Sequence, residues 1–157
     1  MIGRSNHVAA IVSRDPELFP ELIAGLRSAD LLVRMRAADA TEKVTRKKPE
    51  LLQPYKKELL GLMIETKQQE LRWHLAVMIP RLRLTAKERQ AATSSLHSYL
   101  EDRGSIVKTS ALQGLADLAQ DDPSIAPRVM GILRDATRSG TPAMKARSRK
   151  LLLHLKR

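Results

Sequence analysis

A sequence pattern that returns about every 37 residues constrains the fold of this chain more than any other feature. Four segments align without gaps, and successive segments are offset by 38, 36 and 37 residues. These segments are residues 31–44, 69–82, 105–118 and 142–155. A recurrence of this length indicates a repeated supersecondary unit, so each residue is best interpreted by its column in the alignment.

The aligned columns follow the spacing of one face of an α-helix. Starting from Val33, apolar or small residues occupy positions i, i+4, i+7, i+8 and i+11, which is a single helical stripe. A basic residue follows the first column in every segment. The five columns of the stripe are Val33/Leu71/Val107/Met144, Ala37/Leu75/Ala111/Ser148, Ala40/Met78/Gly114/Leu151, Thr41/Ile79/Leu115/Leu152 and Val44/Leu82/Leu118/Leu155.

A second helix is expected before each of these segments. Residues 15–20 and 122–127 share the motif Asp-Pro-x-x-x-Pro, and residues 49–54 contain a variant of this motif. Proline in a first helical turn costs little, because that N–H has no intrahelical partner. Residues 85–88 instead form a capping-box pattern that opens a helix, and Pro80 is expected to bend or end the helix that contains it.

These signals predict four helix pairs and no strands. The pairs span residues 16–45, 50–82, 86–118 and 124–156, and a short helix over residues 6–13 precedes them. The composition agrees, because aromatic residues make up only 3% of the chain and helix-forming residues dominate. We expect one all-α domain over residues 1–157, in which neighbouring pairs stack to bury their apolar stripes.

Several functional classes are disfavoured by the sequence. The chain has no cysteine, which excludes disulfides, thiolate metal sites and a cysteine nucleophile. No secretory leader or membrane-spanning run is present, so we expect a cytoplasmic protein without a membrane partner. No catalytic or phosphate-binding motif occurs in the sequence. The four histidines are scattered over four predicted helices: His7, His74, His97 and His154. We therefore expect no enzyme activity, cofactor or metal.

The repeat resembles the HEAT repeat, a member of the armadillo-like helical family. The closest copy of its second-helix motif is residues 33–38, Val-Arg-Met-Arg-Ala-Ala, and weaker copies begin at Leu71, Val107 and Met144. The resemblance covers residues 15–156. It implies a right-handed α-solenoid of about four antiparallel helix pairs, with the Val-Arg helices lining a concave face where partners bind.

Two sets of side chains are candidates for function on these helices. The first set is the basic column, which consists of Arg34, Arg72, Lys108 and Lys145. Because this column repeats in register with the apolar stripe, a structural role between neighbouring repeats is the favoured interpretation. Residues off the stripe would form a shallow basic groove, although a solvated helix face looks the same. This predicted groove holds Met35, Arg36, Lys43, Trp73, His74, Arg81, Arg147, Lys150 and His154.

The positive charge is concentrated at one end of the chain. The formal net charge is +11, and the last twenty residues carry seven basic and no acidic residues. Arg149 also stands where the earlier repeats have the small or apolar residues Ala38, Ala76 and Leu112. This helix is therefore interpreted either as a polar end cap or as a surface that contacts nucleic acid or an acidic protein.

We therefore expect a non-catalytic scaffold that presents a basic groove to a peptide or acidic protein. The alternative is sequence-independent binding of nucleic acid, in which Arg36, Lys43, Arg81, Arg147 and Lys150 neutralise phosphates and Trp73 stacks on a base. An enzyme is a third possibility, since HEAT-like DNA glycosylases and bilin lyases exist. No motif of those enzymes matches this sequence residue by residue.

Overall fold

The fold is all-helical over the part of the chain that the structure describes. A computed structural model describes residues 2–155 and the side chains of residues 4–155, and within these limits it contains nine α-helices, three short 3-10 helices and no strand. The chain divides into two compact units between Arg83 and Leu84. Each unit is considered by itself.

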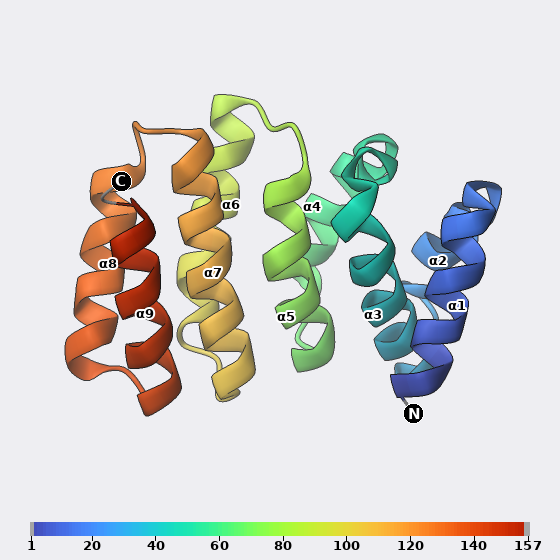
Figure 1. Cartoon of the computed structure of the whole chain (residues 1–157), viewed down its shortest axis with the longest axis horizontal. Helices are drawn as coiled ribbons and strands as arrows, with labels where there is room; N and C mark the ends of the chain where they lie inside the picture. The colour runs from blue at the N-terminus through green and yellow to red at the C-terminus, as the bar shows by residue number, and fades with distance from the viewer. Residues whose placement is uncertain (1, 156–157) are drawn as a thin grey trace. The chain divides into compact units, whose positions relative to one another are not determined.

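The first unit contains five α-helices (Figure 1). They are α1 (Ile2–Arg14), α2 (Phe19–Gly25), α3 (Leu31–Lys47), α4 (Lys56–Glu65) and α5 (Gln69–Met78), with 3-10 helices η1 (Pro16–Leu18), η2 (Pro49–Tyr55) and η3 (Ile79–Arg81). Helix α3 packs against α1, α2 and α5, and α4 packs against α5. The second helices of the predicted pairs, α3 and α5, therefore lie side by side in this unit.

The second unit repeats the arrangement with two further pairs. Its helices are α6 (Ala86–Tyr99), α7 (Ser105–Asp121), α8 (Ala126–Ser139) and α9 (Pro142–Leu155). Helix α7 packs on α6 and α8, α8 packs on α9, and α7 lies directly against α9 (Figure 1). The pairs fall where the sequence predicts them, within a few residues at each boundary.

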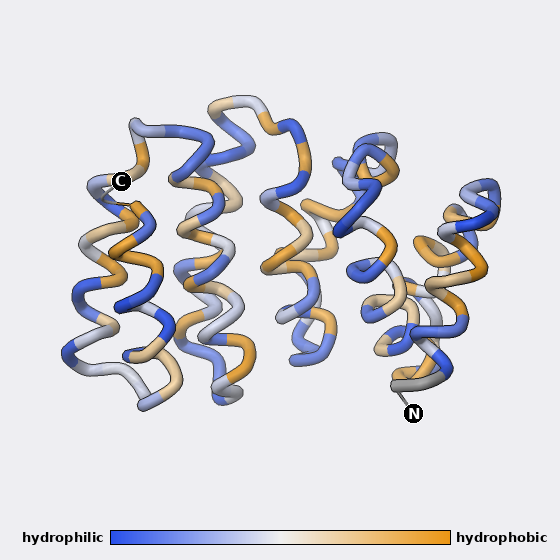
Figure 2. The backbone as a smooth tube through the Cα atoms, viewed as in Figure 1, coloured by the Kyte–Doolittle hydropathy of each residue, from blue (hydrophilic) through white to orange (hydrophobic). Residues whose placement is uncertain are grey.

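Burial follows the predicted stripe. In three of the four segments the columns that begin with Ala37, Ala40, Thr41 and Val44 are buried throughout, and in α9 only Leu152 and Leu155 become half-exposed. Apolar and polar residues alternate along the tube of each helix (Figure 2). Burial of one stripe per helix is the main stabilising contribution expected for such an amphipathic array.

The first column departs from this rule at one position. Leu71, Val107 and Met144 are buried, whereas Val33 is 42% exposed. Val33 stands in the first turn of α3 and borders an open cavity together with Val8 and Leu22. Its side chain is therefore only partly covered by α1 and α2.

The predicted helix boundaries have the expected local causes. Thr85 accepts a hydrogen bond from the Glu88 N–H, and the Glu88 carboxylate accepts one from the Thr85 N–H, which completes the capping box of α6. Helix α5 ends at Met78, and Pro80 lies in the tighter η3 turn that follows. Proline therefore ends this helix, because it cannot donate the next intrahelical hydrogen bond.

Two further sequence-based expectations can be compared with the coordinates. Arg149 is exposed, while its counterparts Ala38, Ala76 and Leu112 are fully buried. Within residues 2–155, no helix combines the length and the apolar composition that crossing a membrane requires.

Candidate functional site

Four of the predicted groove residues of the first unit, Lys43, Trp73, His74 and Arg81, lie along the line where α3 meets α5, which we call the first seam. Arg36 instead borders a cavity shared with α1 and α2. Asp39 on α3 accepts a hydrogen bond from Lys43 Nζ at 2.6 Å, and its other oxygen lies 3.3 Å from His74 Nε2 on α5. Burial alone would raise the pKa of the Asp39 carboxyl. The hydrogen bond and charge of Lys43, together with His74, outweigh burial and hold this pKa below its ordinary value.

His74 is buried in the first seam. Its Nδ1 lies 2.5 Å from the Glu70 carbonyl oxygen, and because a carbonyl can only accept, Nδ1 is the donor. The Trp73 indole Nε1 lies 3.3 Å from the same His74 Nε2 that faces Asp39, so this nitrogen can accept from Trp73 or donate to Asp39 but cannot do both at once. The Trp73 and His74 rings are tilted against each other. Both side chains are therefore held by contacts within the unit.

A second ion cluster closes the other end of the same seam. Glu42 is buried, and its carboxylate pairs with Arg46 one turn later on α3 and with Arg81 Nη2 at 2.7 Å. Arg81 Nη1 also donates to the Glu42 carbonyl and to Thr45 Oγ1, both at 2.8 Å. Arg81 therefore joins η3 to α3 by three hydrogen bonds.

The electrostatics of Glu42 show how strongly this cluster is paired. Burial would raise the pKa of the Glu42 carboxyl, but hydrogen bonds from Arg46 and Arg81, and the charges of both guanidinium groups, hold that pKa below its ordinary value of 4.5. The Glu42 carboxylate is thus the stable form in the fold. Its charge and that of Arg81 largely neutralise each other inside the seam.

The structure therefore gives most predicted groove residues of the first unit a partner within the fold. Lys43, His74 and Arg81 contact acids on α3. Met35, Arg36 and Trp73 are half-buried. The sequence shows Asp39 and Glu42 as interruptions of a basic face, whereas in the structure they are the groups that pair with it.

The equivalent line between α7 and α9, the second seam, has different partners. Arg147 occupies the alignment column of His74, and it donates to Gln113 Oε1 at 2.8 Å, where Gln113 occupies the column of Asp39. Ala116 stands in the column of Glu42 and His154 in that of Arg81. No acid of α7 therefore faces the predicted binding residues of α9 in these columns.

Helix α9 turns a broad basic face to solvent. Arg147, Arg149, Lys150 and His154 are exposed, and Leu153 among them is 66% exposed. Among residues 4–155, the structure records no acidic partner for the basic side chains of this helix. We call this surface the α9 face, and it consists of Arg147, Arg149, Lys150, Leu153 and His154.

Each residue of the basic column is the fourth residue of its own helix. Arg34 Nε donates to Gln68 Oε1 at 3.0 Å, which links α3 to the residue that precedes α5. Arg72 Nε donates to the Thr66 carbonyl at 2.9 Å, within the turn before its own helix. Lys108 and Lys145 are half-buried, and Lys108 borders a cavity of about 330 Å³ in the second unit.

The sequence-based candidates do not include a cavity that lies near these turns in the first unit. It has a volume of about 660 Å³ and is bordered by the turn before α3 and the turn before α5. Of its lining residues, only Arg34 belongs to a predicted set. The signal that could have indicated it is the coincidence of Arg27, Arg34 and Lys67 at the turns of two successive repeats, since such turns lie at the same end of a stack.

Comparison of the chain with protein-family models, with curated proteins and with solved structures finds no match. The function has to be inferred from the geometry and chemistry of the surfaces themselves.

Proposed function

We propose that this chain is a non-catalytic binding module of HEAT-like helix pairs, and that its α9 face binds an acidic protein or peptide. The observation that carries the proposal is the difference in pairing between the two seams. Acids on α3 pair with Lys43, His74 and Arg81, whereas Arg147 of α9 meets the neutral Gln113 and no acid. Positive charge that the fold does not neutralise is available to a partner.

The proposed architecture is a right-handed solenoid of about four helix pairs. It is supported by the recurrence of the same buried columns in both units, and by the way second helices lie side by side within each unit. An array of this kind buries its stripes through contacts between neighbouring repeats and leaves an extended surface for partners. The likeness to HEAT repeats rests on residues 33–38 and their weaker copies.

A binding role is favoured over catalysis because the carboxyl groups with a shifted pKa in the first seam are paired with cations of the same unit. The two carboxyls of the first seam with a lowered pKa, Asp39 and Glu42, are paired with cations of the same unit, and neither borders the 660 Å³ cavity. Structural ion pairs perturb pKa values in this way without any reaction. The α9 face, in contrast, is an exposed basic surface for which the described residues record no acidic partner.

An acidic protein suits the α9 face better than nucleic acid does. Leu153 is exposed one turn from Arg149 and Lys150, so a partner can bury an apolar side chain between charge pairs. The nucleic-acid hypothesis uses Trp73 as a stacking platform. Trp73 is instead half-buried and directs its N–H to His74, so its ring is committed to packing within the unit.

The proposal can be tested with labelled octaglutamate, and with a short DNA duplex as the competing probe. Binding of each probe to the full chain is measured by fluorescence anisotropy between about 50 and 200 mM salt. The double variant Arg149→Ala/Lys150→Ala is expected to weaken octaglutamate binding about tenfold, because two unpaired cations are removed. The matched control is Lys47→Ala/Lys57→Ala, which removes the same charge from exposed positions of the first unit.

The control variant is expected to bind octaglutamate within about twofold of the unaltered chain. Equal losses in both double variants would mean that the probe senses only net charge, and the proposal for the α9 face would be wrong. Tighter binding of DNA than of octaglutamate at every salt concentration would favour the nucleic-acid alternative.

A further inference from the structure

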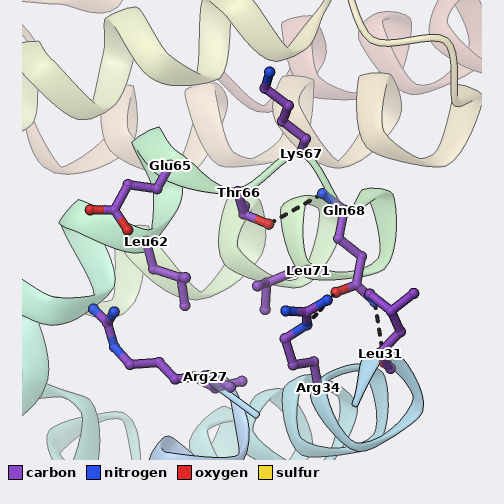
Figure 3. A pocket seen from close by; sticks show the side chains of 10 residues that line it. Arg27, Leu31, Arg34, Leu62, Glu65, Thr66, Lys67, Gln68 and Leu71 are labelled. Atoms are coloured by element: carbon purple, nitrogen blue, oxygen red, sulfur yellow. Dashed lines mark hydrogen bonds between the residues drawn. The ribbon is translucent and has the colours of Figure 1, made fainter. Parts of the chain in front are cut away.

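The cavity at the turns before α3 and α5 combines an apolar floor with arginine side chains. Leu26, Leu62 and Leu71 are buried and border it. Leu62 and Leu71 lie across the cavity from Arg27 and Arg34 (Figure 3). Its volume of about 660 Å³ falls in the range of ordinary ligand pockets, about 300–1,000 Å³. The Lys67 side chain extends away from this group (Figure 3).

Arg34 of this cavity is oriented by a hydrogen bond and retains unused donors. Arg34 Nε donates to Gln68 Oε1 at 3.0 Å, and the Gln68 amide nitrogen in turn donates to the Leu31 carbonyl at 3.3 Å. Among the described residues the two terminal nitrogens of Arg34 have no hydrogen-bond partner. A guanidinium oriented through Nε with both terminal nitrogens unpaired matches the two oxygens of a carboxylate.

Arg27 is only partly neutralised. Its Nε donates to Glu58 at 2.7 Å, and both side chains are substantially exposed, so this pair is a weak surface interaction. Of the charged side chains that border the cavity, Arg27, Arg34 and Lys67 are basic and Glu65 is acidic, but Lys67 extends away from the others (Figure 3). Because Arg27 is paired with Glu58, the positive charge available to a ligand in the cavity is mainly that of Arg34.

The second unit has a cavity at the equivalent turns, with a different lining. Seven of its lining residues lie 74 positions after a lining residue of the first cavity, including Leu100 after Leu26 and Lys108 after Arg34. Glu101 stands in the position of Arg27, and Asp135 adds a second acid. The repeat thus places a cavity at these turns, and the individual residues determine its charge.

We propose that the first-unit cavity binds a peptide segment of an acidic partner, with an aliphatic side chain on the leucine floor and a neighbouring carboxylate on Arg34. A peptide fits better than a small molecule because Leu31, 60% exposed, borders the cavity and extends its apolar surface towards solvent. A chain that continues past the cavity covers Leu31 as well. This site lies on α2–α5 and does not depend on the α9 face.

The test uses a blocked pentapeptide of alternating glutamate and leucine, and its analogue with serine in place of leucine. Binding to the full chain is followed by the NMR methyl resonances of Leu26, Leu62 and Leu71, which report on this cavity alone. We expect the leucine peptide to shift these methyl resonances and to bind about tenfold more tightly than the serine analogue, because leucine side chains leave water.

Two variants and one matched control show where the peptide carboxylate binds. Arg34→Ala is expected to weaken binding of the leucine peptide about tenfold. Arg27→Glu, which introduces the residue found at this position in the second cavity, is expected to weaken binding at least as much. Lys108→Ala removes the counterpart cation of the second unit and is expected to leave the affinity unchanged. Unchanged methyl spectra of the Arg27→Glu variant without peptide establish that its fold is intact.

The proposal is overturned if the serine analogue binds equally well, if Arg27→Glu binds like the unaltered chain, or if Lys108→Ala causes the same loss. The variant Arg149→Ala/Lys150→Ala separates this site from the proposed function. Retained pentapeptide binding by that variant, together with shifts of the three leucine methyl resonances, supports the cavity even if octaglutamate fails to bind the α9 face.

Discussion

The first and second seams occupy the same place in the repeat but satisfy their polar groups in different ways. In the first seam, Asp39 meets His74, and Glu42 meets Arg81. In the second seam Gln113 accepts a hydrogen bond from Arg147, and the columns of Glu42 and Arg81 hold Ala116 and His154. One backbone arrangement therefore supports an internally paired seam in one unit and an unneutralised basic helix in the other.

This difference shows that the role of a basic residue on these helices cannot be inferred from its own helix alone, because it depends on the residue that faces it. Arg81 and Arg147 both project from second helices of a pair or from the turn that ends one. Their roles are determined by the residue that the preceding repeat presents. A buried acid such as Glu42 makes the cation structural, whereas a neutral residue such as Gln113 leaves its charge available.

The largest effect that could break this comparison is expected at Arg81. Arg81→Ala removes three hydrogen bonds and leaves the buried Glu42 with Arg46 alone, so we expect the free energy of unfolding of the first unit to fall by about 2–3 kcal/mol. Urea denaturation followed by fluorescence of Trp73, the one tryptophan of the chain, measures this. The matched variant His154→Ala should change stability, followed by circular dichroism, by less than about 0.5 kcal/mol.

A smaller effect is expected from pH. The pKa of Glu42 is lower in the fold than in the unfolded chain, so its stabilising contribution is complete above its ordinary pKa of 4.5 and is lost as the pH falls below that value. Asp39 acts in the same direction. The difference in urea midpoint between the unaltered chain and Glu42→Gln should therefore narrow on acidification through this range. A constant difference from pH 7 to about pH 3 would contradict the pairing.

The smallest effect comes from giving the second seam an acid. Gln113→Glu places a carboxylate beside Arg147, and we expect a stability gain of less than about 1 kcal/mol because the pair is exposed. Octaglutamate affinity should fall about twofold, since part of the charge of Arg147 is then neutralised. Gln113→Ala breaks the same contact without adding charge. If it weakens octaglutamate binding as much as Gln113→Glu does, charge pairing at Arg147 is not the cause.

The helices and their buried faces were largely predictable, because both depend on periodic features of the sequence. Columns such as Ala37/Leu75/Ala111/Ser148 are buried throughout, and Thr85 and Pro80 mark helix boundaries as expected. These features need only local spacing and the rule that an amphipathic helix buries one face. Val33 was harder to predict, because its burial depends on how fully α1 and α2 cover the first turn of α3.

The pairing of the candidate site was not predictable from a single helix face. The Glu42–Arg81 pair joins residues 39 positions apart. In the sequence, Glu42 is only an acidic residue within a basic stretch, and nothing there indicates its partner. The first cavity likewise depends on how Gln68 orients Arg34 across a turn. Such contacts depend on side-chain direction between repeats, which the columns of an alignment do not contain.

The most direct test of the account is an amide NMR titration of the full chain with octaglutamate at low salt. The account predicts that the shift changes concentrate on α9, around Arg147, Arg149 and Lys150, and that the α3–α5 seam around Asp39 and Glu42 changes little. Changes concentrated on the first seam, with α9 unaffected, would contradict it.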